Sequence, residues 1–83
     1  MKFNLENFSG TIKKLRKEKG ATQADVAKFL GCFYQNYQSL EYGKTTPSAS
    51  TLFQLAEYFN VSTDYLLGRT DIRETPGKSV KFV

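Results

Sequence analysis

Twenty residues near the middle of the chain decide its fold: Gln23-Ala24-Asp25-Val26-Ala27-Lys28-Phe29-Leu30-Gly31-Cys32-Phe33-Tyr34-Gln35-Asn36-Tyr37-Gln38-Ser39-Leu40-Glu41-Tyr42. A small residue, Ala27, stands four positions before Gly31, and apolar residues flank both at helical spacing. A small side chain lets two helices approach closely, and a glycine adopts the left-handed backbone that a tight turn needs. The pattern predicts two short helices that cross at a steep angle.

Two helices in this arrangement form a helix-turn-helix, whose second helix is shaped to enter the DNA major groove. The charge distribution is compatible with such a partner. Residues 1–20 hold six basic and two acidic side chains, so this segment alone accounts for the net charge of +4. A basic helix face suits DNA phosphates, although most lysine-rich helix faces are simply solvated. We therefore expect double-stranded DNA as the partner.

The bulk composition excludes several other classes. With 83 residues, 40% of them hydrophobic and 24% charged, the chain fits one soluble domain. Its apolar runs are too short to span a membrane, and its first residues do not resemble a secretion signal, so a cytoplasmic protein without a membrane partner is expected. Cys32 is the only cysteine and histidine is absent, which excludes histidine-dependent triads and clustered zinc ligands. We expect no enzyme activity, cofactor, metal or small-molecule ligand.

Apolar stripes and stop signals predict five helices, at about residues 9–18, 22–30, 33–41, 49–59 and 63–67. Thr22 is a good N-cap, with Asp25 in the capping-box position, and Ser62 is suited to cap the last helix. Glycines or asparagine follow the predicted ends. The predicted core face consists of Phe8, Ile12, Leu15, Val26, Ala27, Leu30, Phe33, Tyr37, Leu40, Leu52, Leu55, Ala56 and Phe59.

The two ends of the chain are less regular. Segments 2–5 and 80–83 have strand-like composition, so they either pair with each other or with a second copy, or remain loose tails, as termini often do. We divide the chain into an N-terminal segment 1–7, a domain 8–69 whose helix-turn-helix is 23–42, and a C-terminal tail 70–83.

Several segments of the chain occur in the order and spacing of a known family. They are Ile12 to Gly20, Thr22-Gln23, Val26-Ala27, Leu30-Gly31, Leu40 to Lys44, Pro47-Ser48, Leu52 through Leu55-Ala56 to Val61-Ser62, and Asp64 to Gly68. Over residues 8–69 the chain resembles the Cro/repressor-type, or XRE-like, helix-turn-helix family. The resemblance implies an all-α, compact five-helix, lambda-repressor-like domain that places its third helix in the major groove, usually as a dimer on a palindromic operator.

The resemblance also implies roles for residues outside the third helix. Gln23 corresponds to the position that holds a DNA phosphate, which is reasonable at a helix start because its backbone amides favour an anion. Lys44 corresponds to a second phosphate contact. Arg16 and Glu41 correspond to a partly buried ion pair that holds the first helix against the third, and such a pair is costly to break from one side.

Base reading falls to the outward face of the third helix. Gln35 is the best candidate, because a carboxamide forms two hydrogen bonds to adenine N6 and N7. Tyr34 aligns with the other main reading position. Secondary candidates are Asn36, Gln38 and Ser39. Since this face carries no Arg or Lys, the commonest guanine contact is missing, and we expect an operator read at A·T pairs or through DNA shape.

Three residues depart from the family pattern. Phe33 stands where Ser or Thr usually caps the third helix, and a phenyl ring cannot accept that hydrogen bond. Tyr37 replaces Ile or Val, and a buried tyrosine needs a partner for its hydroxyl group. Cys32 replaces a common Val, which is a modest change to a small buried group.

These observations favour a DNA-binding transcriptional regulator, most simply a repressor. The alternative is a protein-interaction module, such as an antitoxin or a partner-binding subunit, with reduced DNA binding. That alternative gains if Phe33, Tyr34 and Tyr42 form one exposed apolar patch. A homodimer is expected in the main hypothesis. We expect its interface near Leu66 and Leu67, with the region of Tyr58 and Phe59 or the terminal segments as other choices.

Overall fold

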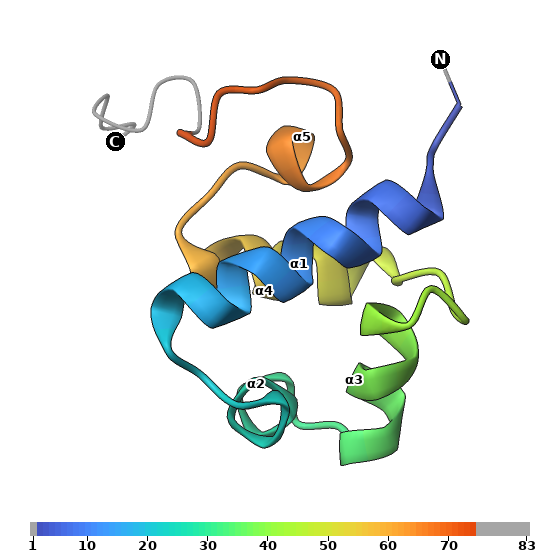
Figure 1. Cartoon of the computed structure of the whole chain (residues 1–83), viewed down its shortest axis with the longest axis vertical. Coiled ribbons are helices and arrows are strands. Elements are labelled where there is room, and N and C mark those ends of the chain that lie inside the picture. The colour runs from blue at the N-terminus through green and yellow to red at the C-terminus, as the bar shows by residue number, and fades with distance from the viewer. Residues whose placement is uncertain (1, 75–83) are drawn as a thin grey trace.

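The structure is a computed structural model that describes residues 2–74, which fold into five helices without a strand (Figure 1). The helices are α1 (Leu5–Lys19), α2 (Gln23–Leu30), α3 (Tyr34–Glu41), α4 (Ala49–Phe59) and α5 (Thr63–Leu66). α1 crosses over α4 at the centre of Figure 1, with α2 and α3 on one side of this pair and α5 on the other. The predicted all-α, five-helix architecture is confirmed.

The ends of α2 and α4 agree with the sequence prediction because local capping residues set them. At the start of α2, the Asp25 backbone N–H donates to the Thr22 hydroxyl oxygen (3.0 Å), and the Thr22 N–H donates to the Asp25 carboxylate (2.9 Å). This capping box satisfies two donors that a helix start otherwise leaves unpaired. Asn60 ends α4 in the left-handed conformation, with φ of 55°.

The predicted start of α1 was wrong. The helix begins at Leu5, because the side chain of Asn4 accepts a hydrogen bond from the Asn7 N–H at 2.9 Å. Ser9, which we expected near the helix start, is buried inside the helix, and its hydroxyl group donates to the Leu40 carbonyl oxygen at 2.6 Å. Of the alternatives left open for segment 2–5, the structure shows no strand there, because residues 2–4 are irregular and Leu5 is helical, and segment 80–83 lies outside the described residues.

Most of the predicted core is confirmed. The buried hydrophobic residues are Phe8, Ile12, Leu15, Val26, Ala27, Tyr37, Leu40, Leu55, Ala56, Val61 and Leu66, with Leu30, Cys32, Leu52 and Phe59 partly buried against them. Phe33 is the exception, because 77% of its surface is exposed. It stands before the first turn of α3 with an extended backbone (φ −69°, ψ 147°), so it does not continue the stripe of Tyr37 and Leu40.

The residues just after α5 fold back onto the helices. The Ser62 backbone N–H donates to the Arg73 carbonyl oxygen at 2.6 Å. The Arg73 guanidinium group makes two contacts with the Glu18 carboxylate, at 2.8 and 3.1 Å, and lies 5.4 Å from the centre of the Tyr65 ring. These contacts raise the pKa of Arg73 and lower that of Glu18. The beginning of the C-terminal segment is thus attached to α1 and α5.

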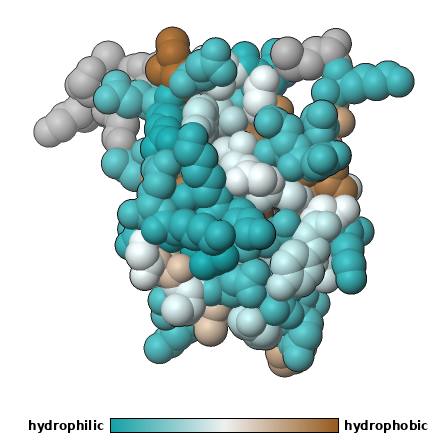
Figure 2. All heavy atoms as spheres, in the orientation of Figure 1, coloured by the Kyte–Doolittle hydropathy of each residue, from teal (hydrophilic) through white to brown (hydrophobic). Residues whose placement is uncertain are grey.

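The surface is mainly hydrophilic on the face shown in Figure 2, where hydrophobic side chains show only in small, separate areas. Leu66 is fully buried in the core and Leu67 is partly exposed, so of these two residues Leu67 is the one that can contribute to the dimer interface expected in this region. Within residues 2–74, none of the helices is both long and apolar enough to cross a membrane.

Candidate nucleic-acid interface

The turn between α2 and α3 has the geometry that the small residue and the glycine predict. Gly31 takes the left-handed conformation with φ of 70°, and the Cys32 N–H donates to the Ala27 carbonyl oxygen at 3.1 Å. Ala27 is buried between the helices. In Figure 1, α2 is seen nearly end-on while α3 runs across the view, so the two helices cross steeply. This arrangement leaves one face of α3 at the surface.

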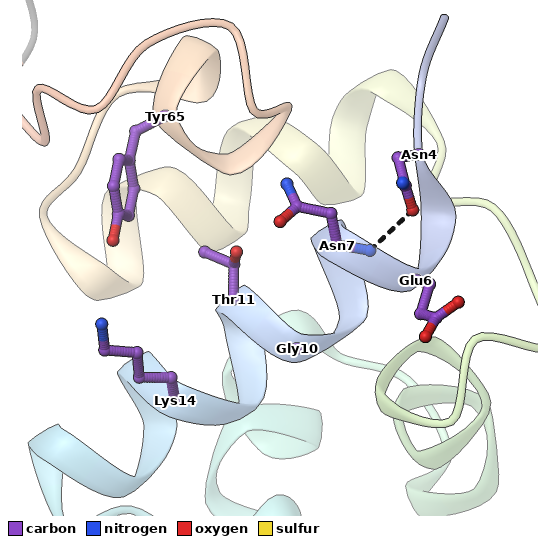
Figure 3. A pocket seen from close by; sticks show the side chains of 7 residues that line it. All are labelled: Asn4, Glu6, Asn7, Gly10, Thr11, Lys14 and Tyr65. Atoms are coloured by element: carbon purple, nitrogen blue, oxygen red, sulfur yellow. Dashed lines mark hydrogen bonds between the residues drawn. The ribbon is translucent and has the colours of Figure 1, made fainter.

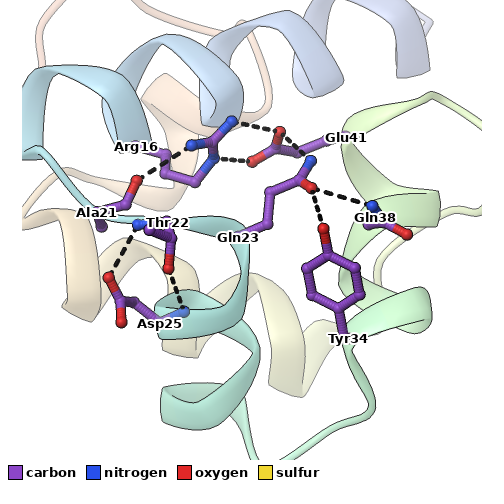
Figure 4. Close-up of polar contacts among 8 residues, drawn as sticks. All are labelled: Arg16, Ala21, Thr22, Gln23, Asp25, Tyr34, Gln38 and Glu41. Carbon is purple, nitrogen blue, oxygen red and sulfur yellow. Dashed lines mark hydrogen bonds and ion pairs between the residues drawn. The ribbon is translucent and has the colours of Figure 1, made fainter.

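Gln23, the first residue of α2, connects α2 with α3 (Figure 4). Its Oε1 atom accepts hydrogen bonds from the Tyr34 hydroxyl group and from Nε2 of Gln38, both at 3.1 Å. Its Nε2 atom donates to the Glu41 carboxylate at 3.0 Å. Since a carboxylate only accepts, this bond fixes the orientation of the Gln23 amide. One side chain thereby holds two predicted base-reading residues in position.

The Arg16–Glu41 ion pair lies directly behind Gln23. Arg16 Nε and Nη2 contact the two carboxylate oxygens of Glu41 at 2.6 and 3.1 Å, and Arg16 Nη1 donates to the Ala21 carbonyl oxygen. The Glu41 side chain is fully buried and that of Arg16 is 13% exposed. Burial alone raises the pKa of Glu41, but the hydrogen bonds from Arg16 and Gln23 outweigh it, so the net pKa is lowered. The pair joins α1 to the end of α3.

Tyr37 lies close to both members of this pair. Its ring is fully buried, and within the described part of the chain its hydroxyl group has no hydrogen-bond partner. Burial raises the pKa of Tyr37, with the Glu41 carboxylate as a further cause. The hydroxyl group therefore stays neutral, and residues 2–74 supply no partner of the kind expected for a buried tyrosine.

The five predicted base-reading residues do not all point freely to solvent. Gln35 and Asn36 are exposed, and Tyr34 is 44% exposed although its hydroxyl group is held by Gln23. Gln38 is half-buried and also bonded to Gln23, while the Ser39 hydroxyl group donates to the Gln35 carbonyl oxygen at 3.0 Å. The exposed end of this face is the N-terminal end of α3.

The basic residues occupy more than one side of the molecule. Lys44 is exposed just after Gly43, close to the C-terminal end of α3. Lys14 lies on α1 near Tyr65 of α5, at a shallow depression that is also lined by Asn4, Glu6, Asn7, Gly10 and Thr11 (Figure 3). Lys14 thus faces α5 and not α3. The basic residues of segment 1–20 therefore do not all lie on the same side of the molecule as the exposed face of α3.

The exposed aromatic residues in and next to α3 lie at its two ends and do not form one patch. Phe33 and Tyr34 stand at its N-terminal end, whereas Tyr42, which is 55% exposed, is the residue that ends the helix. The eight residues of α3 separate Phe33 from Tyr42, so the two lie nine helical steps, or about 13 Å, apart along the axis. The continuous apolar surface that would favour a protein-interaction module is therefore absent from this part of the chain.

Comparison with known proteins agrees with this geometry. A helix-turn-helix family model matches residues 12–66. The chain is 43% identical over 63 residues to an SPbeta prophage-derived uncharacterized HTH-type transcriptional regulator, YonR, of Bacillus subtilis strain 168, covering 76% of this chain and 58% of that protein. It is also 43% identical over 63 residues to the uncharacterized HTH-type transcriptional regulator y4dJ of Sinorhizobium fredii, covering 76% and 79% of the two chains.

A solved structure of a transcriptional regulator from Listeria innocua superposes with a TM-score of 0.74 at 27% identity, covering 84% of this chain and 63% of that one. The fold and the α2–α3 geometry define a lambda-repressor-like helix-turn-helix domain. The chain belongs to the XRE-type helix-turn-helix family. It spans about half the length of several curated regulators that it matches.

Sequence reasoning missed two features of this region. The buried bond from Ser9 to the Leu40 carbonyl oxygen supports the end of α3, and a lone serine on an otherwise apolar helix face gives little signal of it. The second is the exposure of Phe33. Its signal was present, because a residue in the capping position lies outside the helix and need not follow the helical stripe.

Proposed function

We propose that this chain is a sequence-specific transcriptional regulator that represses by binding a palindromic operator as a dimer, with α3 in the major groove. The observation that carries the proposal is the surface of α3. Its exposed face is polar and uncharged, and Gln23 fixes two of its side chains from the neighbouring helix. A prearranged polar face of this kind suits base edges, because less side-chain freedom is lost on binding.

Within this proposal, Gln35 and Asn36 are the residues most accessible to bases, and Tyr34, Gln38 and Ser39 contribute from defined positions. Gln23 and Lys44 contact phosphates on either side of α3, Gln23 through the start of α2, where backbone N–H groups favour an anion. Arg16 and Glu41 act by holding α1, α2 and α3 together. Because α3 lacks Arg and Lys, the operator is read at A·T pairs or through DNA shape.

The proposal assigns DNA binding to residues 8–69 and a cytoplasmic location to the protein. One helix-turn-helix reads only a few base pairs, so a dimer on two half-sites one helical turn apart supplies the missing affinity. Because Leu66 is buried, the dimer contact has to use other residues of this region, such as Leu67, Tyr58 or Phe59.

A fluorescence-anisotropy titration tests the proposal. Operators are first selected from a random duplex library, and the selected and scrambled duplexes are then titrated at several salt concentrations. We expect tight binding to the selected duplex that weakens when Gln35 becomes alanine, by the ~1–3 kcal/mol of a two-bond adenine contact. Glu57→Ala, on the exposed surface of α4, is the control. Equal, salt-sensitive binding to both duplexes would mean that only the basic surface acts, and the proposal would fail.

A further inference from the structure

Phe33 has no evident role in the fold. It is 77% exposed, the largest exposed fraction among the large hydrophobic residues of the described chain. It occupies the N-cap position of α3 but forms no side-chain capping bond. An exposed phenyl ring in place of a capping hydroxyl gives up stability of α3 and keeps apolar surface in water. A residue that breaks a local rule without a structural gain points to a functional site.

The surroundings of Phe33 indicate which surface would cover it. It directly precedes Tyr34 and Gln35, at the end of α3 whose residues contact base edges when such a helix lies in the major groove. The apolar group that B-DNA presents there is the C5-methyl group of thymine, which phenyl rings contact favourably. The neighbouring residues of α3 are uncharged and suited to adenine. In one A·T pair, these residues would contact the adenine while Phe33 contacts the thymine on the other DNA strand.

We propose that Phe33 is a specificity-determining residue that recognises thymine through its C5-methyl group. This inference rests on the proposed function, since it requires α3 to lie in the major groove. A protein partner fits the position less well, because the exposed ring beside Phe33, Tyr34, carries a polar hydroxyl group bonded to Gln23, and Tyr42 follows the opposite end of α3. At this position a side chain that could cap α3 is replaced by an apolar side chain that recognises DNA.

Replacement of thymine by deoxyuridine tests this contact, because uracil keeps the Watson–Crick pairing and lacks only the methyl group. Each thymine of the selected operator is replaced in turn, and the anisotropy titration is repeated. Wild-type protein is expected to lose roughly fourfold in affinity at one or two positions of each half-site, which corresponds to the burial of one methyl group. The Phe33→Ser variant is expected to bind the thymine operator more weakly and to be insensitive to uracil at those positions.

Two further variants complete the design. Phe53→Ser removes a phenyl ring that is 61% exposed on α4, and it should keep the wild-type pattern of uracil sensitivity. Phe33→Leu retains an apolar side chain and should restore part of the sensitivity that Phe33→Ser loses. Circular dichroism verifies that each variant is folded.

The outcomes separate this inference from the proposed function. If wild-type protein does not distinguish the selected from the scrambled duplex, the proposed function fails and the inference fails with it. If the protein is specific but Phe33→Ser shows the same uracil losses as wild type, the proposed function stands and the thymine contact is refuted. Unchanged affinity of Phe33→Ser for every duplex would likewise refute it and direct attention to a protein partner for this ring.

Discussion

The starts of α2 and α3 solve the same physical problem differently. α2 begins with a complete capping box of Thr22 and Asp25, and its first residue is bonded into the interior through Glu41. Only three residues separate α3 from α2, and the last of them, Phe33, is exposed and supplies no side-chain cap. The difference indicates that α2 holds α3 in position, whereas the start of α3 lacks a stabilising cap and exposes an apolar side chain instead. Each part of this comparison can be tested.

Removal of the buried Arg16–Glu41 ion pair, the anchor that holds α1 and α2 against α3, should have the largest effect on stability. Glu41→Ala leaves the Arg16 guanidinium group, 13% exposed, without its carboxylate, and also releases Gln23. We expect a loss of about 3 kcal/mol in the free energy of unfolding, as for other broken buried pairs. Urea denaturation at pH 7 measures it.

An exposed ion pair, which joins Glu18 of α1 to Arg73 after α5, is the matched control. Glu18 and Arg73 have similar geometry, but their side chains are 43% and 41% exposed, so Glu18→Ala should cost less than about 1 kcal/mol. Losses of equal size in the two variants would show that Glu41 does not act as an anchor.

Low pH should weaken the Arg16–Glu41 ion pair, but by less than the Glu41→Ala substitution does. The pKa of Glu41 is lower in the folded protein than in the unfolded chain, so the folded state binds fewer protons. Its contribution is complete above the unfolded pKa of about 4.3 and is lost as the pH falls through the folded value. The loss should be smaller than in Glu41→Ala, because a protonated carboxyl group still accepts hydrogen bonds. Thermal melts between pH 7 and pH 3 should show less dependence on pH in Glu41→Gln; an identical profile would contradict the assignment.

The capping box of α2 should contribute less than the buried pair. Thr22→Ala removes the bond from the Asp25 N–H, and we expect a loss of about 1 kcal/mol. Thr45→Ala, in the exposed loop after α3, is the control and should be neutral. Urea denaturation of both variants provides the measurement. If Thr22→Ala is also neutral, the start of α2 is no better supported than that of α3.

Local signals predicted most of the fold, and long-range contacts account for what they missed. The capping box, Gly31 and the Asn60 stop act within a few residues, so the bounds of α2 and α4 could be obtained from sequence. The bond of Ser9 to Leu40 joins residues 31 positions apart, and that of Arg73 to Glu18 joins residues 55 apart. No local pattern contains such pairs.

The candidate site was predictable to a similar degree. The Arg16–Glu41 pair, which came from the family resemblance, is present in the structure. The bonds of Gln23 to Tyr34 and Gln38 were not foreseen, because they depend on how α2 crosses α3. Phe33 was misplaced because i, i+4, i+7 spacing was applied to a residue that lies just outside the helix.

A cap restored at the start of α3 should have the smallest effect on stability, and of opposite sign. In Phe33→Ser the hydroxyl oxygen can accept a hydrogen bond from a first-turn N–H group of α3, which a phenyl ring cannot do. We expect a gain of about 0.5 kcal/mol, or a rise of roughly 2–4 °C in the melting temperature. Phe33→Ala, which cannot cap, should not show this gain.

A stabilised Phe33→Ser protein that binds its operator less well would establish that α3 gives up a cap for recognition. If Phe33→Ser is less stable than wild type, the ring supports the fold after all, and the contrast between the two helix starts disappears.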